Sequence, residues 1–144
     1  MTRYLLDTNI LSEAVKARPS PSLTRWLESQ ADRDLFVTTL TIAEIWRGIL
    51  ESPRGKRRRD LEAWFAGPTG PQALFQGRIL SFSEEAAIEW GRMMAEGTAS
   101  GRPRSALDTM IAATAAANGC IVATANERHF EGVVEFFNPL RGGS

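Results

Sequence analysis

The chain has 144 residues, of which 43% are hydrophobic and 24% charged, a composition typical of a water-soluble globular protein with one domain. Its 17 Lys and Arg residues balance its 17 Asp and Glu residues, so net charge gives no support to general polyanion binding. The sequence contains no apolar stretch near the roughly 20 residues of a membrane span and no signal-peptide pattern, and its one cysteine excludes an internal disulfide, which together predict a cytoplasmic protein without membrane contact.

The predicted elements alternate between short apolar strands and helices with i, i+3, i+4 apolar spacing. In chain order, we expect a strand at 3–7, helices at 10–16 and 22–30, a strand at 34–39, a helix at 41–50, a basic run at 54–59, a helical pattern at 61–65, a strand at 79–82, helices at 83–100 and 105–118, and strands at 120–124 and 133–137. This alternation predicts an α/β fold with a mostly parallel sheet covered on both faces. We expect one domain over 1–140 and a flexible tail over 141–144.

Three acids occupy equivalent points of this pattern. Asp7 ends the first strand, Glu44 falls in the first turn after the second strand, and Asp108 falls in the first turn of the helix before the 120–124 strand. The carboxyl ends of parallel strands meet at one edge of a sheet, where ligands bind. Carboxylate oxygens suit Mg²⁺ or Mn²⁺, and such an ion activates water for attack on a phosphodiester.

A structural role for the same acids is the alternative. Thr41–Glu44 matches a capping box, Ser105–Asp108 nearly does, and Asp7 is able to cap the helix that follows it. Acids in a first helical turn also interact favourably with the helix dipole. Asp7, however, follows buried apolar residues, where an unpaired charge is costly and a cation is the simplest compensation. Spacing alone leaves both alternatives open.

Several segments, in their order along the chain, match the motifs of one family. They are Tyr4–Ser12, Thr41–Ile49, Ser105–Ala113, Ala123–Phe130 and Phe137–Pro139. The chain resembles PIN domains over nearly its whole length, and specifically the VapC-type toxin nucleases of prokaryotic toxin–antitoxin pairs. Each motif alone is weak, but the first four of these segments in the right order are specific, and Phe137–Pro139 matches the usual end.

The resemblance implies a three-layer α/β/α sandwich and a Mg²⁺- or Mn²⁺-dependent endoribonuclease that hydrolyses RNA. It also implies a homodimer, inhibited by a cognate VapB-type antitoxin whose C-terminal segment covers the active groove. Asp7, Glu44 and Asp108 carry over as the catalytic, metal-binding acids. Polar residues near the metal and its water carry over more loosely: Thr8, Asn9 and Thr124.

His129 departs from the family pattern, because many relatives carry a fourth acid at this position. This histidine either contacts the metal, binds a phosphate, or packs in its loop, and packing is slightly favoured. Asn126 either supplies a neutral oxygen or holds the loop. We therefore expect one metal ion rather than two.

Basic residues near the predicted site are candidates for holding phosphate. Arg102 and Arg104 lie just before Asp108 and suit a substrate phosphate or an antitoxin carboxylate. The basic run at 54–59 is better explained as a solvated helix start than as an RNA contact.

A catalytically impaired PIN fold that only binds RNA or protein is the alternative function. A haloacid-dehalogenase-type phosphatase is disfavoured, because Asn9 stands where that family needs a second acid. The sequence does not identify the RNA target, the antitoxin, or the acid that accepts the proton of the attacking water.

Overall fold

The computed structural model describes residues 2–141, and its centre is a five-stranded parallel sheet with the order β3-β2-β1-β4-β5. The strands are β1 (Tyr4–Leu6), β2 (Leu35–Thr38), β3 (Ile79–Leu80), β4 (Ile121–Ala123) and β5 (Phe136–Phe137). The chain fills the sheet on one side of β1 and then on the other, so β1 lies at the switch point of the strand order. At such a point the loops after neighbouring strands diverge and leave a crevice for a ligand.

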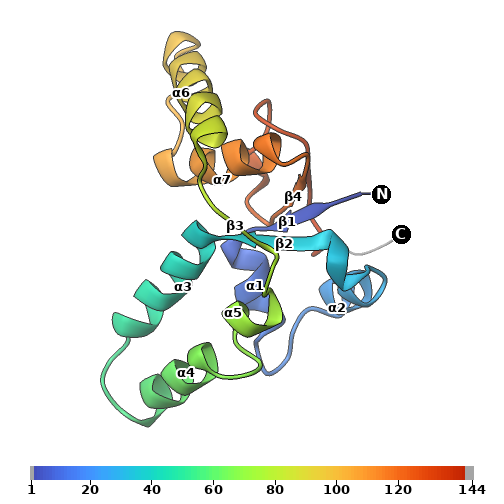
Figure 1. Cartoon of the computed structure of the whole chain (residues 1–144), viewed down its shortest axis with the longest axis vertical. Helices are drawn as coiled ribbons and strands as arrows, with labels where there is room; N and C mark the ends of the chain where they lie inside the picture. The colour runs from blue at the N-terminus through green and yellow to red at the C-terminus, as the bar shows by residue number, and fades with distance from the viewer. Residues whose placement is uncertain (1, 142–144) are drawn as a thin grey trace.

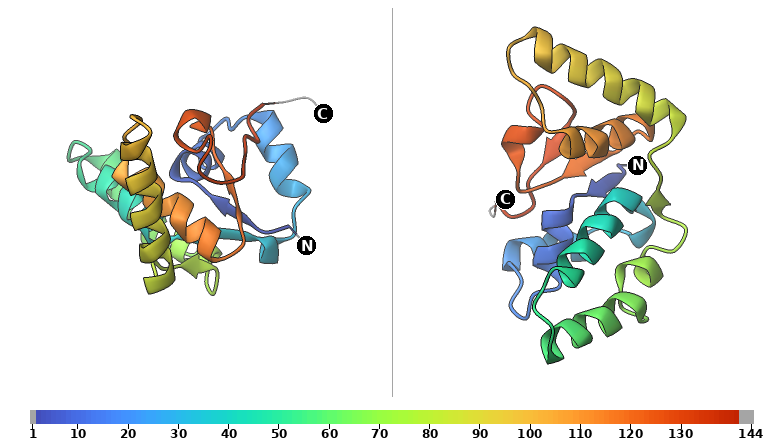
Figure 2. Two further views of the ribbon diagram at one scale, coloured as in Figure 1. Left: turned by 90° about the horizontal axis from the view of Figure 1, so that it is seen from above. Right: turned by 90° about the vertical axis from the view of Figure 1, so that its left-hand side faces the viewer.

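Helices cover both faces of the sheet, which confirms the predicted three-layer sandwich (Figures 1 and 2). The helices are α1 (Thr8–Ala14), α2 (Pro21–Glu28), α3 (Thr39–Leu50), α4 (Lys56–Ala66), α5 (Pro71–Leu74), α6 (Glu84–Ala99) and α7 (Ala106–Ala117), with short 3₁₀ turns η1 (Asp32–Asp34) and η2 (Glu127–His129). Helices α6 and α7 lie on one face, and α1, α2, α3 and α5 lie on the other (Figure 1). Helix α4 packs on α3 and α5, away from the strands.

Two hydrophobic cores form because successive strand residues point to opposite faces. Leu5 and Val122 are fully buried in the core beneath α6 and α7. Leu6 and Ala123, one residue further along the same strands, belong to the core beneath α1, α2 and α3. Burial on both faces explains why these strands are continuous apolar runs rather than alternating ones.

Helix α3 begins earlier than its sequence suggests, and this corrects the position of Glu44. The N-cap is Thr38, whose Oγ1 accepts a hydrogen bond from the Thr41 N–H at 3.0 Å. The predicted capping box at Thr41–Glu44 is therefore wrong, and Glu44 lies in the second turn rather than the first. Thr38 both ends a buried strand and supplies the capping hydroxyl, so no loop separates the two elements.

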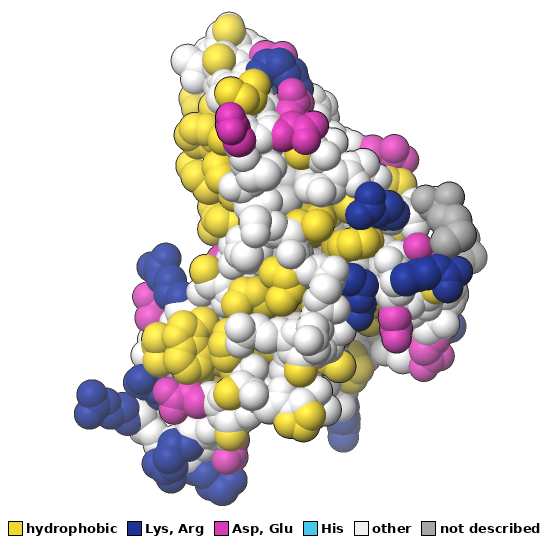
Figure 3. Space-filling model, viewed as in Figure 1, with side chains coloured by type: hydrophobic (Ala, Val, Ile, Leu, Met, Phe, Trp, Pro, Cys, Tyr) yellow, Lys and Arg dark blue, Asp and Glu magenta, His cyan; other side chains and the backbone are white. Residues whose placement is uncertain are grey.

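The basic run at 54–59 spans the turn into α4, at the end of the molecule where Lys and Arg side chains gather at the lower left of Figure 3. Two of its side chains pair with acids one turn further along the same helix, Lys56 with Asp60 at 2.8 Å and Arg58 with Glu62 at 3.6 Å. The exposed Lys56–Asp60 pair agrees with a solvated helix start, whereas the Arg58–Glu62 pair is partly buried.

Arg141, the last described residue, pairs with Glu127 at 2.5 Å, whereas the rest of the predicted tail, 142–144, lies outside the described residues. Over residues 2–141, no helix has the length and apolar character that a membrane span requires.

Candidate active site

Asp7 stands where β1 passes into α1, and its buried carboxylate is held by three donors. Oδ1 accepts from the Thr8 N–H at 2.8 Å, and Oδ2 accepts from Asn9 Nδ2 at 2.9 Å and from Thr124 Oγ1 at 2.8 Å. Only 2% of Asp7 is exposed. Burial raises its pKa, the bonds from Thr124 and Thr8 partly oppose this, and the charge of Asp108 raises the pKa further. Asp7 is thus both a helix cap and a desolvated acid.

Asn9 and Thr124 join the loop after β1 to the loop after β4. Asn9 Oδ1 accepts from the Ala125 N–H at 2.9 Å, and Thr124 Oγ1 accepts from the Asn126 N–H at 2.9 Å. These bonds fix the donors that surround Asp7. Asn126 is exposed and contributes here through its backbone N–H rather than through its amide.

Glu44 reaches the same edge from α3 and is bound by a hydroxyl of α1. Thr8 Oγ1 donates to Glu44 Oε1 at 2.5 Å and lies 3.2 Å from Thr41 Oγ1. Thr41 Oγ1 in turn lies 3.3 Å from Thr38 Oγ1, and both of these threonines are fully buried. Burial raises the pKa of Glu44, the bond from Thr8 opposes this, and the charges of Asp7 and Asp108 raise it further. The sequence does not single out Thr38, and it suggests Thr41 as the cap of α3 rather than as a neighbour of Thr8, although a threonine between an apolar strand and a helix is a signal for a cap.

Asp108 lies in the first turn of α7 and contacts His129. Its N–H is bonded to the Ser105 hydroxyl that caps the helix, and its Oδ2 lies 2.5 Å from His129 Nδ1. The His129 side chain is 45% exposed, so the expectation that it packs in its loop is wrong. An ionised carboxylate only accepts hydrogen bonds, so Nδ1 carries the hydrogen when Asp108 is charged. His129 therefore orients the carboxylate of Asp108 and does not take the place of a fourth acid.

The three acids share one edge of the sheet but each has its own donors. Their charges act on one another, because Asp108 raises the pKa of both Asp7 and Glu44. Within residues 2–141, no three His, Cys, Asp or Glu side chains form a ready-made cluster for a bare ion. Each carboxylate is instead held by its own hydrogen-bond partners or, for Asp108, by its contact with His129.

These residues nevertheless fit a hydrated Mg²⁺ or Mn²⁺ ion. Their donor set is made only of carboxylate oxygens, and Mg²⁺ keeps several of its waters, which extend its reach. Two of the acids are desolvated and repel their neighbours, which a divalent cation would relieve. The set offers no thiolate, and its one imidazole nitrogen near the acids is bound to Asp108, so softer metals are disfavoured.

The structure separates the two arginines proposed as phosphate contacts. Arg104 Nη1 donates to the Met93 carbonyl at 2.5 Å and lies 3.9 Å from Glu96 Oε2, so Arg104 attaches the α6–α7 turn to α6. Arg102 is exposed. Only Arg102 of this pair keeps its guanidinium at the surface.

Comparison with known proteins gives a consistent result along the chain. The model of the PIN domain family matches residues 4–135. VapC ribonuclease Y4jK of Sinorhizobium fredii is 35% identical over 136 residues, covering 94% of this chain and 96% of the relative. Toxin FitB of Neisseria gonorrhoeae is 33% identical, with the same coverage of both chains. The crystal structure of FitAcB from Neisseria gonorrhoeae has a TM-score of 0.88 at 32% identity, covering 96% of this chain and 99% of that chain.

The parallel α/β/α sandwich, with Asp7, Glu44 and Asp108 along one edge of its sheet, is the architecture in which these matches place the chain. The chain belongs to the PIN domain family. Within that family it is of the VapC type.

Proposed function

We propose that this protein is a metal-dependent endoribonuclease that acts as the toxin of a toxin–antitoxin pair. The proposal depends above all on the environment of Asp7. This acid is buried at the switch point of the sheet, burial raises its pKa, and the charge of Asp108 raises the pKa further. The names of the relatives, a VapC ribonuclease and the toxin FitB, support the assignment to RNA cleavage and to a toxin.

Asp7, Glu44 and Asp108 would together hold the ion. When bound, Mg²⁺ or Mn²⁺ lowers the pKa of water and offsets the negative charge of the phosphate. Asp7 is fixed by three donors and serves as the rigid anchor. Glu44 has one donor, on Oε1, and a raised pKa, so its Oε2 is the best placed atom to accept a proton from the attacking water.

The antitoxin would bind in the apolar groove beside Glu44. This groove has a volume of about 390 Å³ and separates α1 from α3 and α4, with Leu11, Ile45 and Trp64 among its lining residues. An amphipathic helix is the kind of segment that fills such a groove. A second copy of the chain would bind elsewhere, on an apolar surface of α6. Ile88 is 72% exposed there, and apolar side chains line the upper left edge of Figure 3.

The proposed function is tested by incubating the purified protein with a mixed pool of single-stranded and structured RNAs. Parallel arms contain Mg²⁺, Mn²⁺ or EDTA, and the Asp7→Asn variant is purified in the same way to reveal contaminating nucleases. Cleavage that needs the metal and is lost in the variant is expected. Cleavage that persists equally in EDTA would refute metal dependence, and equal cleavage by the variant would refute the assigned site.

Divalent metal is expected to raise the thermal midpoint of the protein, more at pH 8 than at pH 5. An acid whose pKa is raised on folding binds more protons in the folded state, so the metal-free protein loses stability as pH rises from about 4 through the raised pKa values of Asp7 and Glu44. Metal removes this cost by binding the ionised acids. At a concentration 100 times Kd the gain is about 2.7 kcal/mol.

Differential scanning fluorimetry with Mn²⁺, Mg²⁺ and EDTA at several pH values measures this effect. Asp7→Asn serves as the control that lacks the shift. A metal-induced shift that is the same in wild type and in Asp7→Asn would place the ion elsewhere.

Removing the donor of His129 is expected to weaken both metal binding and catalysis. Asn places an amide N–H near the position of Nδ1, whereas Leu offers no donor to Asp108. We expect His129→Leu to lose about 10- to 100-fold in kcat and in Mn²⁺ affinity, and His129→Asn to stay within a few-fold of wild type.

Mn²⁺ titration followed by electron paramagnetic resonance, without RNA, separates the metal effect from cleavage. Equal losses in the two variants would show that the imidazole ring matters for something other than its Nδ1 donor. The same titration is expected to give one ion per chain, and a metal-soaked crystal with two ions about 4 Å apart would contradict this.

A further inference from the structure

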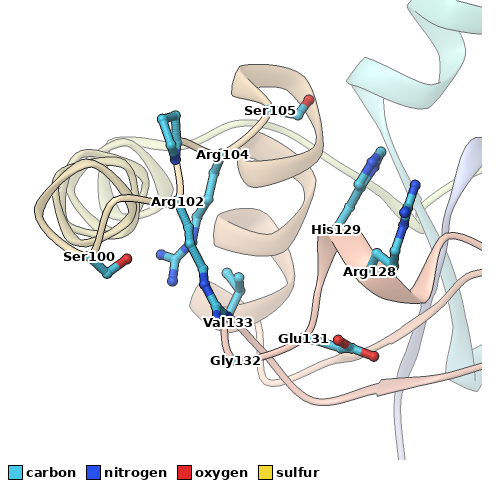
Figure 4. A pocket seen from close by; sticks show the side chains of 10 residues that line it. Ser100, Arg102, Arg104, Ser105, Arg128, His129, Glu131, Gly132 and Val133 are labelled. Carbon is cyan, nitrogen blue, oxygen red and sulfur yellow. The ribbon is translucent and has the colours of Figure 1, made fainter.

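A basic groove lies between the α6–α7 turn and η2, and one of its lining residues, His129, contacts Asp108. Its volume is about 620 Å³, and its lining includes Arg102 and Arg104 on one wall and Arg128 and His129 on the other. In Figure 4 the first wall is the turn between α6 and α7, and the second wall is η2 with the segment that follows it. Glu131 is the one acid of the lining. A chain with no net charge thus concentrates positive charge beside its candidate active site.

Contacts with the rest of the fold hold both walls in place. On the first wall, Gly97 lets the turn approach α6, since a Cβ there would lie 2.9 Å from the Arg102 carbonyl oxygen. The Arg102 N–H donates to the Gly97 carbonyl at 2.8 Å, and Arg104 anchors the turn through Met93. The Arg102 backbone is therefore fixed while its guanidinium stays exposed.

The second wall is held by the end of the chain. Glu127, the first residue of η2, accepts from Asn138 Nδ2 at 2.9 Å and pairs with Arg141 at 2.5 Å. Phe130, just after η2, is fully buried in the core beneath α7. Arg128, between these anchors, is exposed. Over residues 2–141, neither Arg128 nor Arg102 is paired with a carboxylate, so both are available to an anion.

We infer that this groove binds the phosphates of single-stranded RNA next to the cleaved bond, with Arg102 and Arg128 as the contacts and Arg104 as a structural anchor. The inference rests on the proposed function, because it takes Asp108 as part of the site at which RNA is cleaved. His129 links the two sites, since it lines the groove and bonds Asp108. A charged groove that follows a backbone is the usual way to hold a single strand.

An acidic peptide is the other polyanion to consider, and the lining favours RNA. A peptide gains much of its affinity from apolar side chains, and the apolar groove beside Glu44 offers these. The basic groove offers mainly guanidinium groups, hydroxyls and an imidazole, with Pro103 and Val133 as its apolar residues. Guanidinium groups form paired hydrogen bonds with phosphates and with carboxylates alike, so the scarcity of apolar lining is what favours RNA.

The test measures RNA binding without cleavage. The variants, all made in the Asp7→Asn background, are Arg102→Gln, Arg128→Gln and the double variant. Fluorescence anisotropy in EDTA follows the binding of a labelled single-stranded RNA. The salt concentration is varied from about 0.05 to about 0.5 M, a range in which screening changes strongly. Arg33→Gln is the matched control, because Arg33 is exposed in η1, which precedes β2 and so lies at the opposite edge of the sheet. Circular dichroism confirms that each variant is folded.

Each groove variant is expected to reduce the slope of log affinity against log salt by about 0.7, and the double variant by about 1.4. This corresponds to roughly fivefold weaker binding per arginine at 0.1 M salt, taking 1 M as the reference. The control is expected to match the parent. Unchanged slopes in the double variant would overturn the inference, as would a loss confined to binding of an oligoglutamate peptide, which would assign the groove to an acidic partner.

The outcome separates this inference from the proposed function. Metal-dependent cleavage by the wild type with unchanged binding in the double variant leaves the nuclease in place and refutes the groove. Reduced slopes with no cleavage of any RNA by the wild type support the groove and count against the nuclease.

Discussion

Asp7→Asn is expected to lower RNA cleavage by about a thousandfold while leaving the fold intact. The variant removes one of three charges that would hold the ion, and the loss of about 4 kcal/mol of transition-state stabilisation corresponds to three powers of ten in rate. The amide has the shape of the carboxylate, and its oxygen still accepts from the Thr8 N–H that caps α1, whereas its NH2 group no longer accepts from Asn9 and Thr124. The buried charge that it removes is desolvated, so the metal-free variant is expected to melt within a few degrees of wild type.

Single-turnover cleavage in Mg²⁺ measures the activity, and circular dichroism with a thermal melt measures the fold. Glu28→Gln is a suitable control, because Glu28 is an exposed acid at the end of α2 and away from the β1 edge. A variant that cuts as fast as wild type would remove Asp7 from the site. A variant that is unfolded would show that the cap and the loop contacts of Asp7 dominate its role.

Phe130→Ala is expected to destabilise the protein by about 3–5 kcal/mol, the largest loss of stability among the changes considered. Phe130 is fully buried, and among residues 2–141 it is the largest side chain that is. It packs in the core that also contains Leu5 and Val122 of the central strands, so truncation leaves a cavity beside the sheet. Urea unfolding followed by tryptophan fluorescence measures the change in the free energy of unfolding.

Phe130→Leu is the matched control, since leucine keeps most of the apolar volume and is expected to cost less than half as much as alanine. Phe130 follows directly after η2, so the alanine variant is also expected to weaken RNA binding through Arg128, even where the protein remains folded. A loss below about 1 kcal/mol would mean that the site collapses around the missing ring. Full RNA affinity in a folded Phe130→Ala protein would show that η2 is held by Glu127 alone.

The parallel sheet and the positions of Asp7 and Asp108 could be predicted because local signals agreed with the fold. Apolar strands without alternation indicate burial on both faces, and Ser105 is a cap that its helix uses. The start of α3 could not be predicted, because Thr38 and Thr41 are equally good caps and only the end of β2 decides between them. Sequence alone places Glu44 one turn too early for this reason.

Contacts between distant segments were beyond the reach of the sequence. The contact between His129 and Asp108 joins η2 to α7, and the sequence around either residue contains no signal that predicts it. Arg102 and Arg104 look equivalent along the chain, but the close approach at Gly97 turns one inward and leaves the other outside. The residues that sequence analysis assigned best are those whose role depends on neighbours in the chain.

The contacts of Asn138 and Arg141 with Glu127 make η2 sensitive to truncation of the chain. A stop codon placed after Phe137 would leave all five strands and every candidate catalytic acid encoded, and of the described members of the two hydrophobic cores it would remove only Leu140, which packs against the core beneath α1, α2 and α3. It would nevertheless remove the two partners of Glu127 that hold η2 beside Asp108. A variant shortened in this way would keep all three acids of the candidate site and still lose the contacts that hold η2, so its acidic motifs would look intact.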